Sequence, residues 1–262
     1  MKSRQKLRKG IILVSFFLFP AIFYYLSPVV IIQSTINGII NGSFILFLLM
    51  FISALFLGRA YCGWVCPAAG CQEAIFLARD KKAAKGDIVK WIIWVPWIIA
   101  IVFLAIRHGG YKKIDFFYQT KYGLSIGDFN AFIAYLCVLF FLIVIPAFVF
   151  GRRSFCHHLC WMAPFMILGR KIRNITNWAS LQLKADSEKC THCQSCTQNC
   201  PMSLPVEIMV HSNKMENTEC ILCGTCIDVC EFNVIKFVFG NSLQKSNAPD
   251  ADSNAFQNIF DT

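Results

Sequence analysis

Long apolar runs alternate with short polar segments along the first 150 residues of the chain. Four runs, at residues 10–32, 36–57, 91–106 and 131–150, approach or exceed the roughly 20 apolar residues that an α-helix needs to cross a bilayer. Three of them contain a proline, which membrane helices tolerate because neighbouring helices satisfy the backbone groups that it leaves free. The pattern predicts an α-helical membrane protein with four transmembrane helices.

The pattern changes at about residue 184. Residues 184–240 lack long apolar runs and are predicted to form a small soluble α+β domain, with a closing strand in the segment FNVIKFVF. Residues 241–262 are polar and are predicted to be a disordered tail. The predicted membrane domain therefore comprises residues 1–183.

The composition agrees with a membrane protein. Of the 262 residues, 56% are hydrophobic and 15% are charged, which is too apolar for an ordinary soluble domain. The formal net charge is +10 at pH 7. A basic chain can bind nucleic acid, but here the basic residues flank the apolar runs, where membrane topology accounts for them. We expect the lipid bilayer as a partner and no nucleic acid.

Lysine and arginine are unevenly divided among the segments that connect the apolar runs. The first ten residues carry five of them, the loop after the second run six, and the stretch from the fourth run to residue 173 five. The loop after the first run has none, and the loop after the third has four. Because these residues concentrate on the cytoplasmic side, we expect both termini and the small domain to face the cytoplasm from a multi-pass position in the inner membrane.

The second and fourth runs end in similar motifs, FLGRAYCGWVCP and VFGRRSFCHHLCW. Each motif contains a glycine, an arginine, an aromatic residue and a Cys-x3-Cys pair, and each follows two predicted spans. The two halves would then be parallel repeats, related by an axis along the membrane normal. That symmetry would bring four thiols together at the cytoplasmic membrane face: Cys62, Cys66, Cys156 and Cys160.

Three roles are open for these four cysteines. Converging thiolates can hold a third redox centre, such as a further iron–sulfur cluster. Each pair can instead act as a dithiol that exchanges electrons with quinone, because cysteines four positions apart share one face of a helix. A structural role or a zinc site is the remaining alternative. Two cysteines lie outside the motifs: Cys71 is expected to be a small packing residue, with a role as an extra ligand as the alternative, and Cys137 is expected to be a small core residue.

Charged and ionisable residues accompany both motifs. Arg59, Arg152 and Arg153 can favour the negative charge of thiolates, and they can also serve as cytoplasmic anchors of the spans. His157 and His158 lie inside the second motif, where each is a candidate ligand or proton relay, or else part of a solvated turn.

The soluble segment contains two cysteine runs, CTHCQSCTQNCP and CILCGTCIDVCE, each with the spacing C-x2-C-x2-C-x3-C. In bacterial ferredoxins with this spacing, three cysteines of one run bind one [4Fe–4S] cluster and the fourth ligates the other cluster. The spacing predicts a first cluster on Cys190, Cys193, Cys196 and Cys230, and a second on Cys200, Cys220, Cys223 and Cys226. Sets of four cysteines also bind zinc, but two complete runs favour iron–sulfur clusters.

With these spans, motifs and cysteine runs, residues 9–240 resemble the NapH-like family of membrane-bound ferredoxin-type proteins. The family pattern reads C-x3-C-P twice; here Pro67 follows the first motif, whereas Trp161 follows the second. The resemblance implies an electron-transfer subunit rather than a stand-alone catalyst. Such a subunit would link the quinone pool, through bound quinol, or a membrane partner to a redox partner protein or oxidoreductase complex. An accessory factor that matures another metalloenzyme, and a redox sensor, are the alternative functions.

Reporter fusions at three positions test the predicted topology. Fusions at Lys81 and Arg170 are expected to report a cytoplasmic location and a fusion at Lys112 the opposite side, because only the first two lie in the segments richest in lysine and arginine. A cytoplasmic signal from the Lys112 fusion would contradict the orientation.

Overall fold

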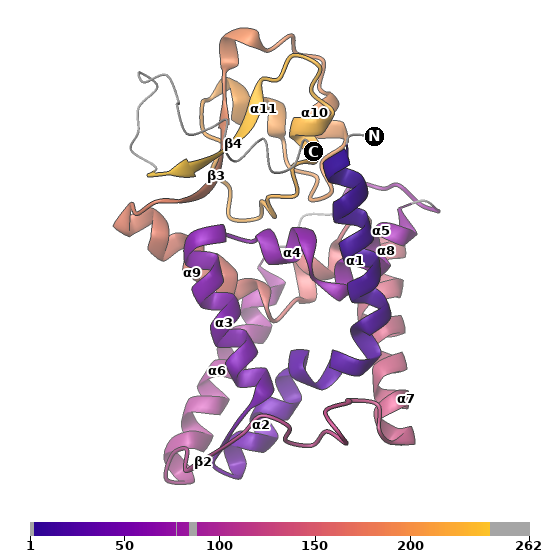
Figure 1. Ribbon diagram of the computed structural model, residues 1–262, viewed down its shortest axis with the longest axis vertical. Helices are drawn as coiled ribbons and strands as arrows, with labels where there is room; N and C mark the ends of the chain where they lie inside the picture. The colour runs from indigo at the N-terminus through magenta and orange to yellow at the C-terminus, as the bar shows by residue number, and fades with distance from the viewer. Residues whose placement is uncertain (1–2, 77, 84–87, 242–262) are drawn as a thin grey trace.

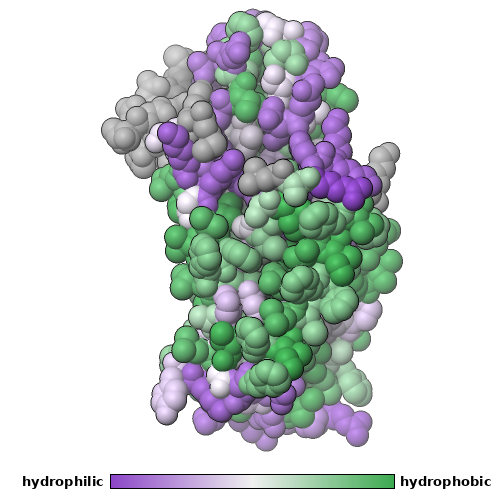
Figure 2. Space-filling model, turned by 90° about the vertical axis from the view of Figure 1, so that its right-hand side faces the viewer, coloured by the Kyte–Doolittle hydropathy of each residue, from purple (hydrophilic) through white to green (hydrophobic). Residues whose placement is uncertain are grey.

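The computed structural model describes residues 3–76, 78–83 and 88–241. Within these ranges a tall helical part and a small domain lie end to end, and the start of α1 (Ser3–Ile22) lies beside the small domain (Figure 1). On the face shown in Figure 2, a broad band of apolar surface covers the helical part between two polar ends. An exposed apolar band of this extent marks a membrane-interacting surface.

Three segments of the described chain are long and apolar enough to cross a membrane: Ser3–Ile36, Val89–Arg107 and Phe129–Phe150. A further apolar helix, α3 (Gly42–Leu57), has only 16 residues. At 1.5 Å per residue it is about 24 Å long, which is shorter than a hydrocarbon core of about 30 Å. The described part of the chain is therefore mostly helical with three candidate spans, and the predicted set of four spans is not confirmed.

The first apolar run is not the single helix that the sequence predicts. α1 ends at Ile22, the short 3₁₀ helix η1 (Phe23–Leu26) follows, and α2 (Pro28–Ile36) starts at a proline. Ser27 is extended, with φ −88° and ψ 125°, because the ring of a proline drives the preceding residue out of the helical region. The break therefore has a local cause in the sequence.

The second run becomes helical later than the predicted residue 36. Gly38 adopts φ +65° in a turn, and strand β1 (Ile39–Asn41) then pairs in parallel with β2 (Lys113–Asp115) at the end of the molecule opposite the small domain (Figure 1). The Asn41 side chain caps α3 by accepting a hydrogen bond from the Phe44 amide (2.9 Å). A turn and a strand therefore occupy residues that were predicted to be membrane helix.

The other two apolar runs are helical close to their predicted positions. They form α6 (Val89–Arg107) and three consecutive pieces, α7 (Phe129–Cys137), the π-helical η2 (Val138–Val144) and α8 (Ile145–Phe150). Pro146 lies in the first turn of α8, just after the π-helical piece. Because proline lacks an N–H and its ring crowds the carbonyl one turn earlier, it favours a wider turn at this point.

Short helices at the junction between the helical part and the small domain carry the Cys-x3-Cys motifs. These elements are α4 (Ala60–Trp64), α5 (Pro67–Ile75) and the π-helical η3 (Phe155–Leu159), followed by α9 (Ala163–Thr176). α5 packs against α1, and α9 packs against α3. The two halves of the chain therefore meet next to the small domain.

The small domain is built on an antiparallel pair of strands, β3 (Ser180–Ala185) and β4 (Ile235–Gly240). Four short helices complete it: η4 (Ser187–Lys189), α10 (Ser195–Gln198), α11 (Val206–His211) and α12 (Thr225–Asp228). β3 starts before residue 184, so the sheet includes residues assigned to the predicted membrane domain. Of the tail predicted to be disordered, residues 242–262 lie outside the described residues.

Candidate iron–sulfur centres

The two cysteine runs of the small domain share one backbone conformation. Residues at matched positions of the two runs have left-handed backbone angles: His192 and Leu222, Gln194 and Gly224, Ser203 and Asn233. The runs then continue into the one-turn helices α10 and α12, whose first carbonyl acceptors are Gln194 and Gly224. Right-handed and left-handed residues in succession gather backbone N–H groups into a concavity that suits anionic iron–sulfur cores. The backbone of both runs fits such a cluster.

Four cysteines line one cavity in the small domain: Cys200, Cys220, Cys223 and Cys226. Most of the remaining wall is apolar, so the thiols are its main donor groups. Burial is the main cause that raises the pKa of Cys200 to about 11 and that of Cys220 to about 12. Thiols with pKa values this high stay protonated near pH 7 unless a metal displaces their protons. The donor set fits a [4Fe–4S] cluster and matches the predicted second set, whose role as ligands stays a prediction.

The first predicted set is more exposed. Cys190, Cys196 and Cys230 are half-buried, whereas Cys193 is exposed. Burial first, and then the nearby Cys190, raises the pKa of Cys196, while hydrogen bonds from Ser195 lower the pKa of Cys193. Cys230 follows α12, which packs against α10, the helix that contains Cys196. The structure brings Cys190 and Cys196 close together, and the membership of all four in one site stays a prediction.

The four cysteines of the Cys-x3-Cys motifs come together from both halves of the chain. Cys62 lies in α4, Cys66 caps α5, Cys156 lies in η3 and Cys160 ends it. All four are between 2% and 4% exposed. Burial raises the pKa of Cys66 well above its ordinary value, and the nearby Cys62, Cys156 and Cys160 thiols raise it further. The result is one buried group of four thiols.

Two side chains outside the motifs contact these thiols. The Cys62 Sγ atom lies 3.4 Å from the Sδ atom of Met166, and Gln72 Nε2 lies 3.5 Å from the Cys156 Sγ atom. Gln72 Oε1 also accepts a hydrogen bond from the Phe155 amide (3.1 Å). Because Gln72 lies in α5 and Phe155 in η3, this side chain ties the two motifs together.

Four basic side chains surround the motifs and are at most 2% exposed: Arg8, Arg59, Lys90 and Arg153. Two carboxylates pair with them. Glu219 binds Arg59 Nη1 (2.8 Å) and Lys90 Nζ (2.5 Å). Glu73 binds Arg8 Nη1 (2.8 Å) and Arg153. Burial opposes the charge of both carboxylates, but the basic neighbours outweigh it and hold each pKa below its usual range.

Positive charge therefore exceeds negative charge in this buried network. Within the described ranges, Nε of Arg153 has no hydrogen-bond partner, and Nε and Nη2 of Arg59 have no oxygen or nitrogen acceptor. The Cys62 and Cys156 thiols lie near Arg59, and Cys156 also lies near Arg153. Because uncompensated buried charge is costly, the network fits an anionic centre on the neighbouring cysteines. Four thiolates on a metal cluster would supply such a centre.

The second cysteine run contacts the first motif directly. Trp64 Nε1 donates a hydrogen bond to the Leu222 carbonyl (3.0 Å), and Arg59 Nη1 donates to the Thr218 carbonyl (3.0 Å). A Cβ atom on Gly63 would lie 2.3 Å from the Ile221 carbonyl oxygen, so only glycine allows this approach. The loop that contains Cys220 and Cys223 is thus held against α4.

Several residues of this junction are not evident from the sequence. No local motif identifies the roles of Glu73, Gln72 and Met166, because the residues that they contact are distant in the chain. Arg152, which the sequence groups with Arg59 and Arg153, instead pairs with Asp80 and donates to backbone carbonyls of the small domain. Trp161, at the position where the family pattern has proline, donates to the Leu26 carbonyl (2.9 Å).

Two family models match the chain. The model described as a 4Fe-4S binding domain matches residues 42–85 and 131–177, which include one Cys-x3-Cys motif each. The model described as a 4Fe-4S dicluster domain matches residues 182–231, which include both cysteine runs.

Curated relatives are similar over most of the chain. An uncharacterized protein of Methanocaldococcus jannaschii is 26% identical over 222 residues, which are 82% of this chain and 78% of the relative. YccM of Escherichia coli is 23% identical over 229 residues (83% of this chain, 60% of YccM). The ferredoxin-type protein NapH of Haemophilus influenzae is 25% identical over 206 residues (68% of this chain, 62% of NapH). No solved structure matches.

Replacing Gly63 by alanine tests the contact between α4 and the second cysteine run. The added methyl group collides with the Ile221 carbonyl, so we expect a destabilisation of about 1–3 kcal/mol. Anaerobic urea unfolding in detergent, followed by the loss of visible cluster absorption, measures it. Gly10→Ala is the matched control, because a Cβ atom at Gly10 meets nothing within 4 Å. Equal midpoints for the two variants would show that the contact is absent.

Proposed function

Because this chain is a NapH-like iron–sulfur protein of the ferredoxin type, we propose that it transfers electrons between the membrane quinone pool, or a membrane partner, and a redox partner protein. The observation that carries the proposal is the junction between α4 and the second cysteine run. There α4, which carries Cys62 of the buried thiol group, packs through Gly63 and Trp64 against the loop that contains Cys220 and Cys223. Two potential redox centres on segments that pack against each other form an electron-transfer chain in this proposal.

In this proposal the membrane domain consists of two parallel repeats, each with two spans. The match of one family model to residues 42–85 and again to 131–177 supports the repeat. In this arrangement α3 is the second span, and its short length is accommodated by flanking residues or by a locally thinner bilayer. The apolar band in Figure 2 supports the membrane position of the helical part.

The small domain, residues 184–240 with the start of β3, faces the cytoplasm in this proposal. The distribution of lysine and arginine supports that side of the inner membrane. The start of α1 is tied to the same end of the molecule, since Arg4 pairs with Asp228 (2.5 Å) and Gln5 Nε2 donates to the Cys223 carbonyl (3.0 Å). The start of α1 and the small domain therefore share one side of the membrane.

The eight cysteines of the small domain hold two [4Fe–4S] clusters in this proposal, in the two sets that cross-ligation predicts. When bound, such clusters accept and release single electrons. The left-handed turns aim backbone N–H groups at each site, and the apolar wall around Cys200 and Cys226 excludes water from the second one. The exposed Cys193 leaves the first site open toward a partner protein.

The buried group of Cys62, Cys66, Cys156 and Cys160 binds a third metal centre in this proposal. Its support is the charge of the surroundings, because the four basic side chains exceed the two carboxylates and leave guanidinium nitrogens without an oxygen or nitrogen acceptor among the described residues. A centre held by four thiolates is negative overall and would compensate this excess. Independent neutral dithiols would leave it uncompensated.

Quinone access is proposed at a small apolar cavity beside the motifs. Its wall includes Phe19, Phe23, Pro67, Phe155 and Trp161. Pro67 and Trp161 directly follow the second cysteine of each motif, so this cavity adjoins the thiol group from both halves. The cavity has a volume of only about 10 Å³, too small for a quinone ring, so in this proposal quinone reaches the aromatic wall only after its side chains move apart.

Paired cysteine substitutions test the shared third centre. We expect Cys66→Ser and Cys160→Ser to slow the reduction of the small-domain clusters by a water-soluble quinol to the same extent. The double variant is expected to add little, because the effects of substitutions in residues that act as one unit are not additive. Freeze-quench EPR of the purified full chain measures the rate, and iron content per chain is expected to fall equally in all three variants. Cys137→Ser is the control, because Cys137 at the end of α7 is exposed rather than in the core as the sequence predicts.

Additive effects would support two independent dithiols and would contradict a shared centre. No reduction of the small-domain clusters by any quinol in the unmodified, fully loaded chain would remove the quinone link. An accessory or sensory role would then be the better account.

A further inference from the structure

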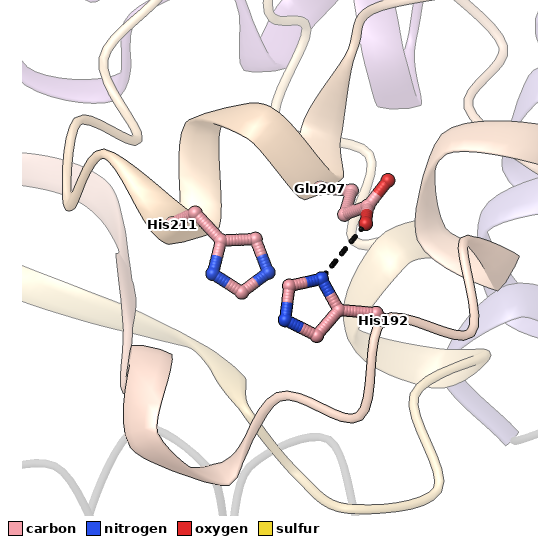
Figure 3. Close-up of side chains that lie close together, drawn as sticks. All are labelled: His192, Glu207 and His211. Carbon is pink, nitrogen blue, oxygen red and sulfur yellow. Dashed lines mark hydrogen bonds and ion pairs between the residues drawn. The ribbon is translucent and has the colours of Figure 1, made fainter.

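A group of ionisable side chains lies in the small domain apart from its cysteines. His192 lies in the first cysteine run between Cys190 and Cys193, while Glu207 and His211 lie in α11. Glu207 and His211 are four positions apart, so they share one face of that helix. Figure 3 shows the three side chains pointing toward one another from the loop and the helix.

The potential donor atoms of this group are close enough for one ion. One donor atom from each of the three residues lies within 4.8 Å of the other two. His192 Nδ1 is 3.2 Å from the Glu207 carboxylate, and the rings of His192 and His211 stack with centroids 3.9 Å apart at 8°. Two adjacent imidazoles with a carboxylate form a donor set that first-row transition metals prefer.

The two segments that carry these side chains are fixed to each other. The Glu207 amide donates a hydrogen bond to Thr197 Oγ1 (2.9 Å), and α10 packs against α11. The site therefore needs only side-chain rotation to close on an ion. Since His192 is largely exposed and the rings are at the surface, this rotation is sterically open.

The cluster fold alone does not require a histidine at position 192. The matched position in the second run is Leu222, which adopts the same left-handed conformation. The second run also has no counterpart of α11, because β4 follows it in the described chain. The three donors are thus a feature of the first run only, and they are additional to the turn geometry that both runs share.

We infer that His192, Glu207 and His211 form a surface site for a divalent first-row transition metal, for which Zn²⁺ is the probe. Two imidazole nitrogens and one carboxylate oxygen suit Zn²⁺, and three protein ligands leave a coordination position for water or for a donor from a partner protein. The site is separate from the twelve cysteines proposed for redox centres. It lies beside the run that contains the exposed Cys193, so a bound cation adds positive charge to this face of the small domain.

Zinc binding to the full chain tests this site, after anaerobic purification with the clusters loaded. Equilibrium dialysis with elemental analysis is expected to give one zinc per chain that saturates while the iron content stays constant. His211→Gln and Glu207→Gln are each expected to weaken the binding by more than about tenfold. His108→Gln, at an exposed histidine beyond α6, is the matched control and is expected to bind as the unmodified chain does.

The iron content and visible absorption of each variant show whether its clusters and fold are intact. Zinc binding that is unchanged in both His211→Gln and Glu207→Gln would overturn the inference. So would zinc uptake that occurs only with loss of iron, because the metal would then be replacing iron at the cysteines. Lack of saturable binding to the unmodified chain would overturn it as well.

Discussion

The buried ion-pair network at the junction is the constraint on which the rest of the structure depends. Glu219 directly precedes Cys220 in the second cysteine run, and it binds Arg59 from the first motif and Lys90 from the start of α6. Removing one partner of such a buried ion pair strongly destabilises a protein, because the other charge then remains buried without a partner. The network therefore fixes the small domain to both halves of the helical part, and its surplus of positive charge favours an anionic centre on the adjacent thiols.

A second contribution to this junction comes from shape. Gly63 allows the backbone of α4 to touch the backbone of the second run, and Trp64 closes the same contact with a hydrogen bond. Gln72 joins the two motifs on the other side. Charge and close packing thus act on the same few residues, and they bring together two groups of cysteines that the sequence assigns to different domains.

The sequence predicts the chemistry of this protein better than its helix boundaries. Cysteine spacing is a local signal, so the ferredoxin-type domain and its family are evident from the order of residues alone, and both agree with the family models. The start of α3 is harder to predict, because Ile39 and Ile40 are apolar and only the parallel pairing with β2 makes them a strand. The roles of Glu73 and Glu219 are the hardest to predict from the sequence. Their basic partners lie far away in the chain, and no periodicity identifies a buried ion pair.

Metal and sulfide analysis of the full chain, purified anaerobically in detergent, tests the central claim most directly. With three [4Fe–4S] sites, we expect about twelve irons and about twelve sulfides per chain. In Cys156→Ser we expect the loss of about four irons, while about eight remain. About eight irons in the unmodified chain, with no other metal present and no change in Cys156→Ser, would contradict a metal centre on the buried Cys-x3-Cys motifs.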